Sequence, residues 1–274
     1  MKKAAFIGVG NMGGALARAA CRAVGPDQVV LFNRTPEKAQ ALGLELGCEV
    51  VDSAADAAWA AEYLFLGVKP NGMPSLLEEL GPQLRDRHRV GEDKVAVSMA
   101  AGLTIKDLRP HLAGAGYYVP IVRLMPNACV AVGKGMTALC AGEAVGEECV
   151  RGVEEILAAS GTVERIPEGL MDQFAAIAGC GPAFVYPYIE GLADGGVMAG
   201  LPRDRAVEYA ARMVMGAAAM VLESGKHPGQ LKDEVCSPGG STIAGVAELE
   251  RHGLRAAAID AVLASWRKSA ELGK

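Results

Sequence analysis

The sequence is poor in aromatic side chains, which make up 5% of its 274 residues, and it has no strong excess of charge of either sign. The formal net charge is -5, and no stripe of lysine and arginine stands out, so we expect no nucleic acid partner. Hydrophobic residues make up 51% and charged residues 22%, which is typical of a globular chain rather than a disordered one.

A membrane-spanning segment is also missing. The N-terminal MKKAAFIGVG has an apolar run that is too short for a signal peptide and leads directly into glycines. Residues 173–189 carry no formal charge over nearly the length of a spanning helix, but they contain two glycines and two prolines. We interpret this segment as a buried, kinked helical region and expect no membrane partner.

The seven cysteines show no CxxC spacing, and their number is odd. Both features argue against a disulfide framework and against a zinc site, so we expect no metal. Free cysteines fit a reducing compartment, which favours a cytoplasmic location.

Several catalytic groups of common carbonyl reductases are absent. No YxxxK motif occurs, and none of the four histidines follows a predicted strand in a way that suggests a catalytic base. A 3-hydroxyacid dehydrogenase would place a lysine on the first helix after its nucleotide domain, but residues 166–202 contain none. A protonated imine is already electrophilic, so an imine substrate needs less help from an enzyme acid than a ketone does.

Strand and helix signals alternate up to about residue 165. This rhythm predicts an α/β fold: a Rossmann-type doubly wound parallel sheet with helices on both faces, over residues 1–165. The charged segment between Leu84 and Lys94 is expected to be a solvated loop. The predicted strands cover residues 4–8, 29–32, 50–51, 63–68, 95–99, 118–124 and 136–139.

After about residue 165 the pattern is helical only, which predicts an all-α C-terminal domain over residues 166–274. Helices are expected over residues 170–199, 205–223, 242–250 and 255–272. The second of these has a narrow polar face, which indicates burial on several sides. A subunit interface could supply that burial, so we expect a homo-oligomer.

The segment from Gly8 to Gly13 has the GxGxxG spacing. It follows a predicted strand and opens a predicted helix, which is the context that a dinucleotide-binding turn requires. Gly8 permits the tight turn, Gly10 lets the backbone approach a pyrophosphate, and the helix start at Asn11 and Met12 offers amides to the phosphates. A glycine-rich turn without a ligand is the alternative.

The second predicted strand ends in Asn33, Arg34 and Thr35. An NAD site usually has an acidic residue here, which would repel a 2′-phosphate. Arg34 can instead make a charge-assisted contact with that phosphate, so we expect NADPH to be preferred, with NAD possible. The alternative is that Arg34 is an ordinary exposed arginine.

Two later strands end in segments that can complete the cofactor site. Val68, Lys69 and Pro70 follow one of them, and Met99, Ala100 and Ala101 follow the other. An open parallel sheet binds its ligands at the carboxyl ends of its strands. The small residues of the second segment would leave room for the nicotinamide.

Residues 231–245, LKDEVCSPGGSTIAG, form the most specific segment of the chain. The turn at Gly239 and Gly240 leads into a helix that Ser241 or Thr242 could cap. Amides at such a helix start make a natural carboxylate site, and a capped helix without a ligand is the alternative.

This segment closely resembles the C-terminal signature of the pyrroline-5-carboxylate reductase family. The segments GVGNMG, NRT, VKP, SMAAG, RLMPN, AGCGPAF, DGGVMAGL and HPGQLKD also resemble family segments, in family order. The resemblance implies reduction of L-1-pyrroline-5-carboxylate to L-proline with NADPH or NADH. It also implies dimers that interlock through the helical domain and often assemble into decamers.

The resemblance implies roles for individual residues as well. The backbone amides of Gly240, Ser241 and Thr242 would hold the substrate carboxylate, with Gly239 in the same turn. Thr242 would hydrogen-bond or protonate the ring nitrogen, and Glu168 would lie near the pocket. The glycine turn at Gly10 and the turn at Gly240 are then expected to face one cleft.

Two other functions remain open at this point. One is a different enzyme on the same scaffold, either an imine reductase for a larger ring or a 3-hydroxyacid dehydrogenase. The other is a non-catalytic regulator that binds a dinucleotide.

Overall fold

The computed structural model describes residues 1–143 and 145–272. Contacts between residues divide the chain into two compact units. The first unit holds Met1–Gly179 and the end of the chain from Trp266, and the second holds Cys180–Ser265. The last strand ends at Arg165, and the domain boundary expected after that residue stays a prediction.

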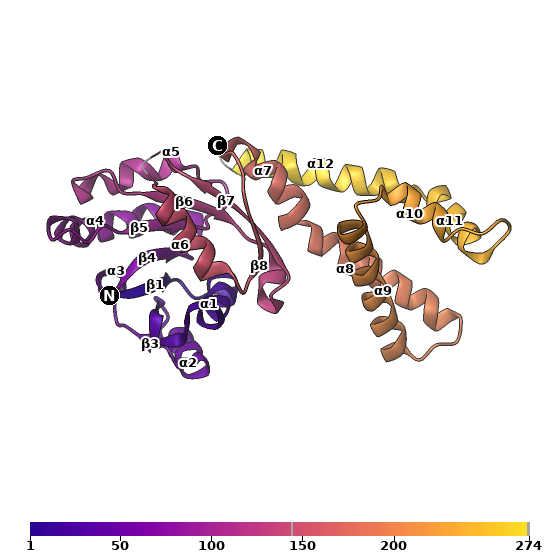
Figure 1. The fold of residues 1–274 in the computed structure, drawn as a ribbon, viewed down its shortest axis with the longest axis horizontal. Coiled ribbons are helices and arrows are strands. Elements are labelled where there is room, and N and C mark those ends of the chain that lie inside the picture. The colour runs from indigo at the N-terminus through magenta and orange to yellow at the C-terminus, as the bar shows by residue number, and fades with distance from the viewer. Residues whose placement is uncertain (144, 273–274) are drawn as a thin grey trace. The chain divides into compact units, whose positions relative to one another are not determined.

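The first unit contains one eight-stranded sheet, with the order β3-β2-β1-β4-β5-β6-β7-β8 (Figure 1). The first six strands are parallel and have the order of a dinucleotide-binding fold. The strands are β1 Lys2–Ile7, β2 Val29–Phe32, β3 Glu49–Val50, β4 Ala61–Leu66, β5 Val95–Ser98, β6 Ile121–Met125, β7 Gly135–Ala141 and β8 Gly161–Arg165.

The sheet is parallel, as expected, except for one antiparallel pair near its far edge. Strand β7 pairs antiparallel with β6, and β8 then pairs parallel with β7. A parallel partner needs a long crossover connection, but β6 and β7 are joined by a short segment with a single 3-10 turn at Ala128–Val132. Helix α6, Glu147–Leu157, connects β7 to β8 and lets these two strands run parallel.

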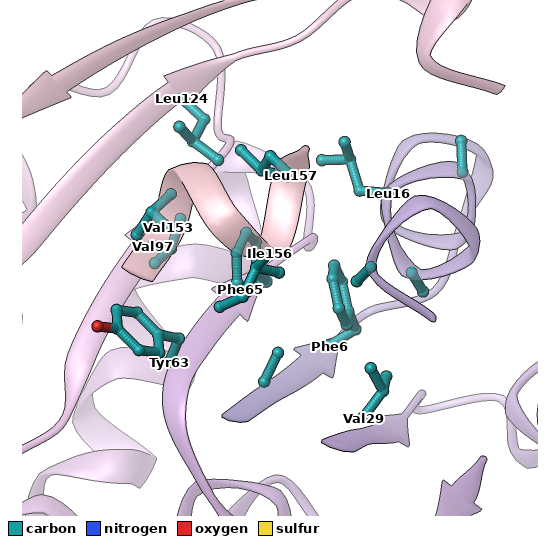
Figure 2. Close-up of a cluster of buried hydrophobic side chains, with 14 of the residues drawn as sticks. Phe6, Leu16, Val29, Tyr63, Phe65, Val97, Leu124, Val153, Ile156 and Leu157 are labelled. Atoms are coloured by element: carbon teal, nitrogen blue, oxygen red, sulfur yellow. The ribbon is translucent and has the colours of Figure 1, made fainter. Parts of the chain in front are cut away.

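Helices cover both faces of the sheet, as predicted. Helices α1 (Asn11–Val24), α2 (Pro36–Leu46) and α6 pack on one face, and α3 (Ala54–Ala60), α4 (Met73–Arg89) and α5 (Ile105–Leu108) pack on the other. Side chains of a strand alternate between these layers: Phe6 lies in the first cluster, and Ile7 lies in the second. Figure 2 shows the first cluster, in which the rings of Phe6 and Phe65 stack at 4.7 Å.

The charged segment after Leu84 is not a loop over its first half, contrary to expectation. Helix α4 continues to Arg89, and its charged residues find partners within the first unit. The Arg87 guanidinium lies 3.5 Å from the centre of the Trp59 ring and donates to the Trp59 carbonyl oxygen at 2.7 Å. The dense charge of this segment predicted a solvated loop. The contacts of Arg87 are with a residue far away in the sequence, and such contacts leave no local pattern that would predict them.

The helical part of the chain differs from expectation in two places: α10 (Pro228–Glu234) was not expected, and the helix expected over residues 170–199 is divided. Helix α7 (Met171–Phe174) and a π-helix at Ala175–Gly179 belong to the first unit, and the π-helix accounts for the expected kink. Of the described residues, none forms a helix with the length and apolar character needed to cross a membrane. The remaining helices are α8 Gly181–Met198, α9 Arg203–Ser224, α10 Pro228–Glu234, α11 Ser241–Arg251 and α12 Leu254–Leu272.

Much apolar surface of the second unit is uncovered in the single chain. On α9 only Ala206 and Ala210 are buried. Exposed large side chains on the same helix are Val207, Tyr209, Met213, Met215, Met220, Val221 and Leu222.

Candidate active site

The glycine turn after β1 brings three segments of backbone into direct contact. Gly8 has a φ of +99°, which favours glycine. A Cβ on Gly13 would lie 2.0 Å from the Gly8 carbonyl oxygen, and a Cβ on Gly67 would lie 2.3 Å from the same atom. The end of β1, the start of α1 and the end of β4 can therefore meet only because all three residues are glycine. Sequence reasoning missed Gly67, although a glycine directly before Val68 was a visible signal.

Gly10 differs from these three glycines because the space that a side chain at this position would take is open. A Cβ on Gly10 would meet no atom within 4 Å, and no side chain caps the helix that starts after it. Asn11 is exposed at the first helical position. The first amides of an α-helix have no partner inside the helix and attract anions. The geometry of the turn suits a dinucleotide pyrophosphate, and the binding roles expected of Gly10, Asn11 and Met12 stay predictions.

Three residues follow β2 directly: Asn33, Arg34 and Thr35. They differ in whether their side chains are bonded within the protein. The Asn33 Oδ1 accepts a hydrogen bond from the Val9 amide at 3.0 Å, and its Nδ2 donates to the Thr35 carbonyl oxygen at 3.0 Å. Arg34 and Thr35 are exposed. Asn33 thus holds the glycine turn in place, and the contact expected between the exposed Arg34 and a 2′-phosphate stays a prediction.

The other predicted cofactor residues lie at the same edge of the sheet. Strands β1, β4 and β5 are neighbours and parallel, so their carboxyl ends lie side by side. The Gly67 amide donates to the Ile7 carbonyl oxygen at 2.8 Å, and the Ala100 amide donates to the Ser98 hydroxyl at 3.3 Å. The structure therefore brings together the strand ends that carry the predicted cofactor residues Val68, Lys69, Pro70, Met99, Ala100 and Ala101.

Glu168 lies in the first unit, and one of its carboxylate oxygens is already engaged. The Oε1 atom accepts the Ile105 amide at 2.7 Å and the Arg123 Nη1 at 3.2 Å. Arg123, on β6, is only 2% exposed. Sequence reasoning did not select Arg123 as a site residue, although an arginine within the apolar strand IVRLM was an available signal.

The second predicted turn lies within the second unit. Gly239 has a φ of +67°, and the Gly240 amide donates to the Ser237 carbonyl oxygen at 3.0 Å. Gly240 itself is the N-cap of α11, so the expectation that Ser241 or Thr242 caps this helix is wrong. These two residues are instead the first two of the helix, and their amides have no partner inside it. The Gly240 amide is therefore engaged, whereas the amides of Ser241 and Thr242 remain for the carboxylate that the sequence predicts at this turn.

The structure describes residues 1–143 and 145–272. Within them, no three side chains of His, Cys, Asp or Glu gather as metal ligands. All seven cysteines are free thiols.

Two family models match the chain. The model described as pyrroline-5-carboxylate reductase dimerisation matches residues 168–272, and one described as NADP oxidoreductase, coenzyme F420-dependent, matches residues 3–102. The pyrroline-5-carboxylate reductase of Escherichia coli (strain K12) is 40% identical over 100% of this chain and 99% of that protein. The chain belongs to the pyrroline-5-carboxylate reductase family.

Solved structures of pyrroline-5-carboxylate reductases agree with this assignment. The Plasmodium falciparum pyrroline carboxylate reductase, crystallised with NADP bound, has a TM-score of 0.86 and 30% identity, and covers 100% of this chain and 98% of that one. The enzyme of Coxiella burnetii has a TM-score of 0.87 and 30% identity, over 100% and 99%. The family resemblance of the sequence and its α/β plus all-helical fold are confirmed.

Proposed function

We propose that the chain reduces the imine bond of L-1-pyrroline-5-carboxylate to give L-proline, with NADPH as the preferred reductant and NADH as a possible second one. The identity with named pyrroline-5-carboxylate reductases over the whole chain carries this proposal. The family assignment disfavours a 3-hydroxyacid dehydrogenase and a non-catalytic regulator.

The cofactor residues hold the dinucleotide without a covalent bond. NADPH, when bound, supplies the hydride that the substrate carbon accepts. Amides at the start of α1 bind the pyrophosphate, and Arg34 binds the 2′-phosphate. The small side chains of Ala100 and Ala101 leave room for a flat ring beside the end of β5.

The turn at Gly239 and Gly240 orients the substrate. Amides of Ser241 and Thr242 hold the carboxylate, and the Thr242 hydroxyl hydrogen-bonds to the ring nitrogen, which carries a proton in the reactive form. Because an iminium carbon is already electrophilic, orientation contributes more than acid strength. That this turn and the one at Gly10 face one cleft stays a prediction, which a crystal structure with NADP and proline bound would check.

The reaction can be tested directly with the purified chain. We expect oxidation of NADPH when pyrroline-5-carboxylate is added, and proline-dependent reduction of NADP at high pH. Thr242→Ala should lose turnover far more than affinity for NADPH, while Thr242→Ser should keep a substantial rate because it keeps the hydroxyl. Normal NADPH binding without any turnover of the wild type would contradict the proposal and favour a regulator.

We further propose that the chain forms a homo-oligomer, either a dimer or a decamer built from dimers, through its helical part. The match of residues 168–272 to a dimerisation model and the uncovered apolar side chains of α9 support this. A hollow of about 630 Å³ between α8 and α9, lined in part by Tyr186, Glu190 and Val207, adds surface for a partner. Elution as a stable monomer at micromolar concentration would contradict it.

A cytoplasmic location is proposed on the free state of the seven cysteines, since disulfides are rare where the compartment is reducing. Cell fractionation followed by detection of the chain would test it.

A further inference from the structure

The segment between β5 and α5 is fastened at both of its ends. At its start, the buried Ser98 hydroxyl accepts the Ala100 amide at 3.3 Å. At its end, the Ile105 amide donates to the Glu168 Oε1 at 2.7 Å. The residues between these two points include Met99, Ala100 and Ala101. The position of that segment therefore depends on a carboxylate that lies 63 residues further along the chain.

Arg123 fixes that carboxylate in turn. Its Nη1 donates to the Glu168 Oε1 at 3.2 Å, and its side chain is only 3% exposed. Arg123 on β6 lies opposite Ser98 on the neighbouring parallel strand β5. The residues that hold the two ends of the segment therefore come from, or contact, adjacent strands. The Nε of Arg123 is buried and finds no partner among the described residues. Burying a guanidinium with so few partners costs desolvation free energy. Apolar residues of similar size at the same place would not have this cost.

We propose that Arg123 and Glu168 are positioning residues for hydride transfer. Their ion pair fixes the position of the backbone from Met99 to Thr104. The proposed function places this segment against the nicotinamide. The inference rests on that proposed function and gives Glu168 a different task from direct substrate binding. A shift of about 1 Å in reacting groups can cost on the order of 100-fold in rate, so a rigid fastener at this place has a direct kinetic effect.

The test uses four variants of the full chain: Arg123→Lys, Arg123→Met, Glu168→Met and the double variant Arg123→Met with Glu168→Met. Each is measured for kcat with pyrroline-5-carboxylate, NADPH affinity by fluorescence titration, the kinetic isotope effect with NADPH deuterated at the transferred position, and the melting temperature. The control is Arg165→Met with Glu154→Met, which removes the partly exposed pair of Arg165 with Glu154 and also the pair of Arg165 with Glu147, both in the same unit.

The three methionine variants should lose kcat by at least about tenfold with little change in NADPH affinity, and the isotope effect should rise because hydride transfer becomes slower. Arg123→Lys should recover part of the rate because it keeps the charge. The double variant should melt at a higher temperature than Glu168→Met, since no unpaired buried charge remains, yet it should stay slow. The control pair should change neither the rate nor the isotope effect.

A purely structural role makes the opposite prediction, that the rate of the double variant recovers together with its stability. That outcome, or methionine variants with wild-type kcat and isotope effect, would overturn the inference while the wild type still reduces pyrroline-5-carboxylate. A wild type that does not reduce this substrate would overturn the proposed function and the inference together, so the two failures are distinguishable.

Discussion

The Asn33 side chain accepts a hydrogen bond from the Val9 amide at 3.0 Å, and so joins the end of β2 to the middle of the glycine turn. Its other amide atom donates to the Thr35 carbonyl oxygen. Both ends of this side chain are therefore used within the protein. Asn33 therefore shapes the glycine turn, and the contact expected between Asn33 and the cofactor stays a prediction.

Asn33→Ala should weaken NADPH binding indirectly. Loss of one such hydrogen bond costs about 0.5–1.5 kcal/mol, which corresponds to roughly 2–10-fold in affinity if the turn loosens. Fluorescence titration with NADPH measures the effect. Gln40→Ala, which removes an exposed amide from α2, is the control and should bind as the wild type does. NADPH affinity unchanged in Asn33→Ala would show that the turn holds without this bond.

Gly10→Ala should impair NADPH binding, whereas Gly13→Ala should impair the stability of the fold. A Cβ on Gly13 would overlap the Gly8 carbonyl oxygen, so Gly13→Ala should lower the melting temperature. A Cβ on Gly10 would meet only open space, so Gly10→Ala should fold normally but bind NADPH weakly. Thermal unfolding and NADPH titration on both variants check this. If Gly10→Ala binds NADPH normally, the pyrophosphate does not lie against Gly10.

Arg34→Ala should lose affinity for NADPH selectively. A charge-assisted contact to a phosphate contributes about 1.5–3 kcal/mol, or roughly 10–150-fold in affinity, and NADH has no 2′-phosphate to lose. Titration with both cofactors measures the ratio. Lys38→Ala, on the exposed side of the next helix, removes a nearby positive charge as a control. An equal loss with NADH and NADPH would contradict the assignment.

Lys94 should make the stability of the fold depend on pH. Its side chain is fully buried, and burial lowers the pKa of its ammonium group to about 8. In the unfolded chain a lysine titrates near 10.4, so between these values the unfolded state binds more protons, and stability rises as pH increases. Below pH 8 both states are protonated and the folded state bears the full cost of the buried charge.

Lys94→Met should therefore raise the melting temperature at pH 7 and flatten the rise of stability above pH 8. The shift corresponds to about 3 kcal/mol at most. Urea unfolding of the variant and the wild type across this pH range measures the difference, and Lys106→Met, on the exposed face of α5, is the control. A variant that is less stable at pH 7, with an unchanged pH slope, would contradict this account.

Local sequence signals predicted the elements that depend on local chemistry. The glycine spacing from Gly8 to Gly13 predicted the first turn and the start of a helix after it, and α1 begins at Asn11. Apolar runs located the central strands within a few residues, because a strand buried on both faces is apolar throughout. The edge strand β8 was missed, since its GTVER has no such run.

Contacts between distant residues decided the rest. Asn127 donates to the Ala178 carbonyl oxygen at 2.9 Å and accepts the Met136 amide at 3.2 Å, so it joins the end of β6 to the π-helix. The pairing of Arg123 with Glu168 and the packing of Arg87 on Trp59 have the same character. Their partners lie far apart in the chain, and no local pattern encodes a distance in space.

The sequence by itself determined the family, the dinucleotide turn and the change from alternating strands to helices, because glycine spacing and hydrophobic period are local properties of the chain. Only the tertiary structure decided which polar groups of the side chains and backbone remain for ligands. Asn33, Gly240 and Glu168 each had a plausible task at a site, but folding brings each of them a partner within the protein. A polar group that is hydrogen-bonded on folding has less left to offer a ligand, and that can be read only once the partners are in place.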